Sequence, residues 1–66
     1  MRRMNMPLVR IELFEGRTDS EKEEMIREVT TAMAASLKID KDDVDIIIQE
    51  IKKKDWATGG VTWDKQ

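Results

Sequence analysis

The chain has 66 residues, of which 39% are hydrophobic and 39% charged, and its formal net charge is −2. A chain this short buries one small core, so several domains and a large enclosed cavity are excluded. It contains no Cys and no His, which excludes disulfides, thiolate or imidazole metal sites and histidine acid–base chemistry. The small negative charge gives no general attraction for nucleic acid or an anionic membrane. We therefore expect a small-molecule ligand and further copies of the chain as partners, with no cofactor or metal.

The first residues lack the features of a targeting or membrane-spanning segment. No apolar run approaches the roughly 20 residues of a membrane span. The basic residues within 1–6 are not followed by the apolar stretch of a secretory signal. We therefore predict a cytoplasmic protein with an N-terminal extension at residues 1–6 and a single domain at residues 7–66.

Residues 7–14 alternate between two faces, which predicts a half-buried β-strand. One face is wholly apolar and the other is mixed; the two sets are Val9, Ile11 and Leu13, and Leu8, Arg10, Glu12 and Phe14.

A helix is predicted from about Thr18 to about Leu37. Thr18 followed by Glu21 has the form of a capping box, in which each residue satisfies a free N–H group of the other. Apolar residues then recur at steps of three and four, which indicates one apolar stripe. Those residues are Met25, Ile26, Val29, Ala32, Met33 and Leu37.

A second strand is predicted from Val44 to about Gln49, because β-branched residues alternate there with other residues. Further on, Gly59-Gly60 lies between Trp56 and Val61, which indicates a short C-terminal hairpin.

The expected architecture is an α+β fold, a β-α-β subunit with two parallel strands, one crossover helix and the hairpin. A right-handed crossover makes the strands parallel and lays the helix on one face of the sheet. The other face, with Leu8, Phe14 and Ile47, remains open. We expect it to be buried against another subunit, so that the protein oligomerises through its sheet.

Four elements carry a family resemblance that extends from Pro7 to about Trp63. They are the proline that begins the first strand, the turn Glu15-Gly16-Arg17-Thr18-Asp19, the strand Val44–Glu50, and Trp56 shortly before Gly59-Gly60. In these elements the chain resembles the 4-oxalocrotonate tautomerase family. The resemblance implies a β-α-β subunit that dimerises through its sheet and assembles as a hexamer, a trimer of dimers, either from one chain or as a hetero-hexamer. It also implies keto–enol tautomerisation of 2-oxo acids with an N-terminal proline as general base.

Pro7 matches the catalytic proline of this family. A proline at a free N-terminus is a secondary amine, and an apolar pocket with nearby cations lowers its pKa toward neutrality. The alternative is a proline that simply begins a strand, where its missing N–H needs no partner.

Three further residues match site positions of the family. Arg17 matches the arginine that binds a substrate carboxylate, for which its planar fork is suited; the alternative is a solvated turn arginine. Trp56 matches the active-site aromatic residue, and packing in the hairpin or an interface is compatible with that role. Phe14 matches a pocket-wall position, or it packs in the core or interface.

The chain departs from the family pattern at two places. Asp45 stands where the family has a second substrate arginine, so turnover of the usual dicarboxylate is doubtful. Residues 1–6 precede Pro7, and a retained extension makes the Pro7 nitrogen an amide without basicity. Initiation at Met6 followed by removal of that methionine would expose Pro7.

Two hypotheses of function remain open. The first is a tautomerase with Pro7 as base, Arg17 as carboxylate anchor and Trp56 and Phe14 as pocket walls, or an enzyme with a related activity such as dehalogenation or decarboxylation of small unsaturated acids. The second is a non-catalytic or partner-dependent subunit of a hexamer. The run Lys52-Lys53-Lys54 is interpreted as solvated, and attraction of an anionic substrate is its alternative.

Overall fold

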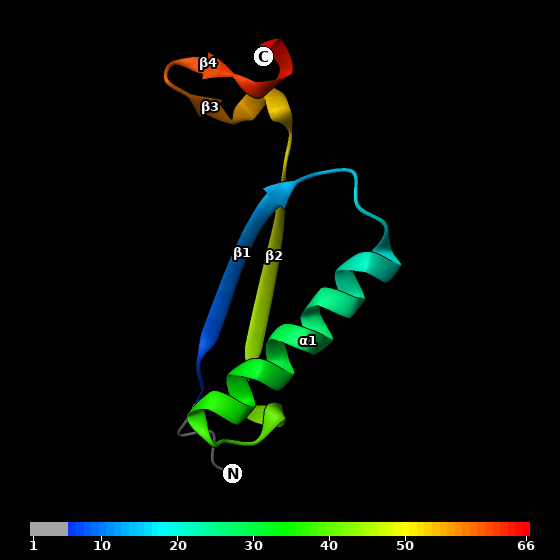
Figure 1. The fold of residues 1–66 in the computed structure, drawn as a ribbon, viewed down its shortest axis with the longest axis vertical. Helices are drawn as coiled ribbons and strands as arrows, with labels where there is room; N and C mark the ends of the chain where they lie inside the picture. The colour runs from blue at the N-terminus through cyan, green and yellow to red at the C-terminus, as the bar shows by residue number, and fades with distance from the viewer. Residues whose placement is uncertain (1–5) are drawn as a thin grey trace.

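The computed structural model describes residues 6–66, and it confirms the predicted order of strand, helix, strand and hairpin (Figure 1). Three short 3-10 helices, η1 to η3, join or end the main elements. In chain order the elements are β1 (Leu8–Phe14), α1 (Asp19–Leu37), η1 (Lys41–Asp43), β2 (Asp45–Ile51), η2 (Lys53–Asp55), β3 (Ala57–Thr58), β4 (Val61–Thr62) and η3 (Trp63–Lys65).

Strands β1 and β2 pair in parallel, from Leu8 opposite Asp45 to Phe14 opposite Ile51. Parallel strands need a long connection, and α1 supplies it. As a result, the residues that follow β1 and those that follow β2 leave the sheet at the same edge. The parallel crossover predicted from the sequence is thereby confirmed.

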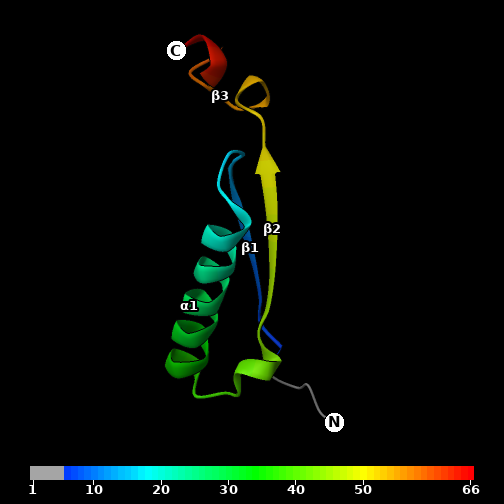
Figure 2. The ribbon, with the colours of Figure 1, turned by 90° about the vertical axis from the view of Figure 1, so that its right-hand side faces the viewer.

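Helix α1 covers one face of the strand pair and leaves the other open (Figure 2). Val9 and Ile11 are half-buried, whereas Leu8 and Arg10 are exposed, so the alternation in the sequence separates the two faces as expected. On the open face Ile47 lies opposite Arg10 and is 45% exposed. An apolar residue at the centre of an uncovered sheet face is a point for contact with another chain.

Defined caps set the limits of α1. The Thr18 hydroxyl accepts a hydrogen bond from the Glu21 N–H at 3.1 Å, and the Glu21 carboxylate accepts one from the Thr18 N–H at 3.0 Å. At the other end Lys38 adopts the left-handed region with φ 58° and its N–H bonds to the Ala34 carbonyl. The predicted capping box and the predicted end at Leu37 are both confirmed.

Replacing Thr18 by alanine should lower the free energy of unfolding by about 1 kcal/mol, because the substitution leaves an N–H group of the first turn without its acceptor. Chemical denaturation at fixed protein concentration measures the change. Thr31→Ala is the matched control, since Thr31 is exposed inside the same helix and alanine is the better helix former there. Equal losses in the two variants would contradict a capping role.

The hairpin is a separate two-stranded unit beyond the carboxyl end of β2 (Figure 1). Thr58 pairs with Val61, and the intervening Gly59 and Gly60 have φ values of 64° and 84°. Two positive φ values define the type I′ turn that suits a two-residue hairpin, and glycine adopts them without strain. The predicted hairpin is confirmed.

No side chain among residues 6–66 is fully buried. The radius of gyration is 15.3 Å, compared with about 11 Å for a compact chain of this length. Large apolar side chains such as Leu8, at 48%, and Val61, at 47%, remain exposed. The apolar surface therefore exceeds what one helix covers.

Candidate active site

A backbone hydrogen bond links the turn after β1 to the end of β2. The Glu15 N–H donates to the Ile51 carbonyl at 3.1 Å, and Gly16 follows with φ 121°, a conformation that glycine adopts readily. Arg17 comes next, exposed and directly before the N-cap Thr18. Arg17 therefore lies at the carboxyl edge of the sheet, on the turn between the end of β1 and the N-cap of α1.

An aromatic cluster joins this edge to the hairpin. The Phe14 ring lies with its centroid 4.3 Å from the Trp56 ring and 5.7 Å from the Trp63 ring. The Trp63 indole N–H donates to the Thr58 hydroxyl at 2.9 Å, and the Trp63 backbone N–H donates to the Trp56 carbonyl at 2.9 Å. Phe14 and Trp56 are half-buried and Trp63 is 38% exposed. The Trp56 and Trp63 rings are tilted by 49° and 57° to the Phe14 ring, so the cluster presents a partly exposed, uneven apolar surface.

The lysine run lies beside this cluster, and its members differ in their contacts. The Lys53 ammonium lies 5.7 Å from the centroid of the Phe14 ring. Lys54 instead pairs with Asp55 at 3.5 Å. Within residues 6–66, neither Arg17 nor Lys53 lies within ion-pair distance of a carboxylate. This edge therefore combines aromatic surface with two cations, Arg17 and Lys53, and one carboxylate, Glu15, none of which has an ion-pair partner within residues 6–66. An anionic ligand with an apolar part could use the cations and the aromatic surface.

Pro7 lies at the opposite end of the sheet. Its carbonyl accepts a hydrogen bond from the Asp45 N–H at 3.0 Å, so it stands beside the start of β2. We call the carboxyl edge of the sheet, with Phe14, Trp56 and Trp63, the aromatic edge. The seven residues of β1 separate Pro7 from it, a distance of roughly 23 Å at the rise of a strand. One chain thus brings Phe14, Arg17 and Trp56 to a common edge and keeps Pro7 away from them.

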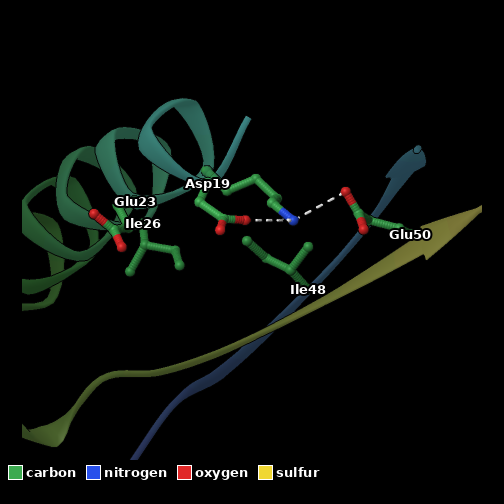
Figure 3. A pocket seen from close by; sticks show the side chains of 6 residues that line it. Asp19, Glu23, Ile26, Ile48 and Glu50 are labelled. Atoms are coloured by element: carbon green, nitrogen blue, oxygen red, sulfur yellow. Dashed lines mark hydrogen bonds and ion pairs between the residues drawn. The ribbon is translucent and has the colours of Figure 1, made fainter. Parts of the chain in front are cut away.

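The hollow between α1 and β2 is a different feature, and none of the predicted site residues lines it. Its volume is about 300 Å³, and Figure 3 shows its lining of Asp19, Lys22, Glu23, Ile26, Ile48 and Glu50. Lys22 forms ion pairs with Glu50 at 3.0 Å and Asp19 at 3.6 Å, and the hydrogen bond to Glu50 raises the pKa of Lys22. Three carboxylates and one ammonium would repel a carboxylate substrate.

Metal-binding clusters and membrane-spanning helices are both absent from residues 6–66. No group of three or more His, Cys, Asp or Glu side chains there is arranged to hold a metal ion. No helix in the same range is long and apolar enough to cross a membrane.

Two contributors to the aromatic edge were not assigned from the sequence, Trp63 and Lys53. A signal for Trp63 was present: a two-residue turn at Gly59-Gly60 places residue 63 opposite Trp56. Lys53 had no such signal, because its neighbours Lys52 and Lys54 carry the same charge.

Comparisons with known proteins identify the family. A family model described as tautomerase enzyme matches residues 7–65. A probable tautomerase from Listeria monocytogenes serotype 4b is 45% identical over 56 residues, which cover 85% of this chain and 92% of the relative. A 2-hydroxymuconate tautomerase from Pseudomonas sp. strain CF600 is 42% identical over 55 residues, which cover 83% of this chain and 87% of the relative.

A solved structure agrees with these sequence matches. A heterohexameric 4-oxalocrotonate tautomerase from Chloroflexus aurantiacus superposes with a TM-score of 0.87 at 35% identity, covering 91% of this chain and 97% of that one. The strand–helix–strand subunit with its hairpin is therefore the tautomerase fold. The chain belongs to the 4-oxalocrotonate tautomerase family.

Proposed function

We propose that the chain is a cofactor-independent tautomerase that interconverts the enol and keto forms of 2-oxo acids, with Pro7 as general base once the preceding residues are removed. The observation that carries the proposal is the edge formed by Arg17, Phe14 and Trp56. It supplies the packed rings of Phe14 and Trp56 and, at the same edge of the sheet, an arginine without an ion-pair partner within residues 6–66. The 2-hydroxymuconate tautomerase among the relatives supports an unsaturated 2-oxo acid as the substrate class.

The chemistry requires one base and one anion anchor. The unprotonated Pro7 amine takes the proton of the enol hydroxyl while the oxygen becomes a carbonyl. The ammonium then returns a proton to carbon, so that one O–H bond breaks and one C–H bond forms. Arg17 holds the carboxylate and stabilises negative charge that develops on the neighbouring oxygen. An apolar wall and the Arg17 guanidinium group of another chain would disfavour the protonated form of the Pro7 amine.

The separation of Pro7 from the aromatic edge requires a second chain in each site. An antiparallel arrangement of two copies would set Pro7 of one against Arg17 and Trp56 of the other. The exposed Leu8 and Ile47 on the open sheet face support such an assembly, because apolar surface of this kind gains stability when it is buried. We therefore propose a homo-oligomer, and a hexamer as its closed form.

A partner-dependent subunit is the second candidate function, and two observations favour it. Asp45, whose backbone N–H donates to the Pro7 carbonyl, stands where the family has a second substrate arginine, so this chain supplies no cation at that position. The solved relative from Chloroflexus aurantiacus is a heterohexamer. Activity of the chain alone, once it begins at Pro7, would reject this candidate. Activity that appears only after a second homologous chain is added would establish it.

Arg17→Ala should raise KM for phenylenolpyruvate by roughly ten- to a hundredfold, because a charged hydrogen bond to a carboxylate contributes about 1.5–3 kcal/mol. Ultraviolet absorbance follows the loss of the enol. Arg27→Ala is the matched control, since Arg27 is exposed on α1 and pairs with Glu24. Unchanged kinetics in Arg17→Ala would show that Arg17 is a solvated turn residue and does not bind the substrate. Both variants are made in the chain that begins at Pro7, and no conversion by that parent chain would reject the proposed function itself.

A further inference from the structure

We propose that the ion pair between Lys22 and Glu50 positions Arg17 for carboxylate binding, although neither Lys22 nor Glu50 touches the ligand. The inference rests on the proposed function only in taking Arg17 as the carboxylate anchor. Lys22 and Glu50 are then positioning residues. The hollow that they line between α1 and β2 is the place where the helix is held to the sheet.

The first support is that the chain is bonded to β2 on both sides of Arg17. Before Arg17, the Glu15 N–H donates to the Ile51 carbonyl at 3.1 Å. After Arg17, the Lys22 Nζ donates to the Glu50 carboxylate at 3.0 Å (Figure 3). The two acceptors are adjacent residues at the end of β2. Loss of the ion pair therefore removes one of the two bonds that hold the segment around Arg17 against the strand.

The second support is the first turn of α1, which connects Lys22 to the residue that follows Arg17. The Lys22 backbone N–H donates to the Thr18 carbonyl at 3.1 Å. Thr18 and Glu21 exchange the two hydrogen bonds of the capping box in the same turn. A capped helical turn has fixed backbone angles, so a displacement of Lys22 moves Thr18 with it. The position of Arg17 therefore depends on where Lys22 is held.

The third support is that the Lys22–Glu50 pair differs from an ordinary surface ion pair in its shielding and its span. Its side chains are 21% and 34% exposed, compared with 65% and 55% for the pair of Arg27 and Glu24. Opposite charges attract each other more strongly when they are partly shielded from water. Lys22 and Glu50 are 28 positions apart, so their pair joins the helix to the sheet, whereas Arg27 and Glu24 lie on one helix.

Kinetics of combined variants test whether Lys22 acts through Arg17. All variants are made in the chain that begins at Pro7. Lys22→Met should raise KM for phenylenolpyruvate roughly threefold to tenfold, because the anchor is displaced. In an Arg17→Ala background the same substitution should change KM less than twofold, since the group that it displaces is already absent. An equal increase in both backgrounds, or no increase in the parent, would overturn the assignment.

Substitutions of the partners test whether Glu50 is the group that holds Lys22. Glu50→Gln should raise KM as much as Lys22→Met does, whereas Lys22→Arg should keep KM within twofold, because a guanidinium group also pairs with a carboxylate. Asp19→Asn is the matched control, since Asp19 is 93% exposed and contacts Lys22 within α1 at 3.6 Å. It should leave KM within twofold of the parent. Equal increases in Asp19→Asn and Glu50→Gln would overturn the assignment in favour of a general effect of charge.

Binding of an unreactive carboxylate separates this inference from the proposed function. Cinnamate carries a carboxylate on a flat conjugated group and does not tautomerise, and isothermal titration calorimetry measures its affinity. An inactive parent in which Lys22→Met weakens cinnamate binding only when Arg17 is present would reject the proposed function and keep the positioning role. An active parent in which Lys22→Met changes neither KM nor cinnamate affinity would reject only the positioning role. A parent that neither converts phenylenolpyruvate nor binds cinnamate would overturn both.

Discussion

Protein that begins at Met1 should convert phenylenolpyruvate at least about a hundredfold more slowly than protein that begins at Pro7. General base catalysis contributes roughly 10²- to 10⁴-fold to a rate, and the Pro7 nitrogen of the long form is an amide that accepts no proton at neutral pH. Intact mass defines the N-terminus of each preparation, and the ultraviolet absorbance of the enol gives the rate. Removal of six residues is the only covalent difference between the two forms.

A second substitution separates the base from other effects of the extension. Pro7→Ala in the long form should leave the residual rate unchanged, because the amide already lacks basicity. Light scattering on the two parent forms checks that both have the same assembly. A long form as active as the short one would show that Pro7 is not the base, and the catalytic assignment would then be wrong.

Ile47→Asp should dissociate the assembly and unfold most of the protein at micromolar concentration. Ile47 lies at the middle of the open sheet face and is 45% exposed in the single chain. Burial of such a side chain contributes about 1.5–3 kcal/mol in each subunit, and an unpaired carboxylate at the same place adds the cost of its desolvation. Light scattering measures the mass and circular dichroism measures the remaining helix.

Leu37→Asp is the matched control for this effect. Leu37 is also exposed, at 51%, but it ends α1 and lies away from the open sheet face. The same chemical change there should leave the assembly intact. A compact, folded monomer of the parent protein, or equal dissociation in both variants, would contradict assembly through the sheet.

Local sequence signals predicted most of the secondary structure, because the interactions behind them span only a few residues. Thr18 and Glu21 bond to each other across three positions. Gly59-Gly60 alone selects the hairpin turn. The start of β2 differs by one residue from the prediction: the strand begins at Asp45, because the Val44 N–H closes the preceding 3-10 turn on the Lys41 carbonyl.

Contacts between residues far apart in the sequence could not be predicted in the same way. Lys22 and Glu50 are 28 positions apart, and no periodicity links a helix residue to a strand residue. The family resemblance named Pro7, Arg17, Phe14 and Trp56 together as site residues. The structure adds that a single chain separates Pro7 from the other three, since parallel pairing places strand starts at one edge and strand ends at the other.

The distance between Pro7 and Arg17 has a genetic consequence under the proposed function. If each site takes its base from one chain and its carboxylate anchor from another, two different defects can compensate each other. A chain whose Pro7 carries the N-terminal extension still contributes Arg17 to the site of a neighbouring chain. A chain without Arg17 still contributes its free Pro7 amine. Co-expression of two alleles whose products are each inactive alone would then restore activity in a fraction of the sites. A cell that starts translation at both Met1 and Met6 would set its activity by the ratio of the two products.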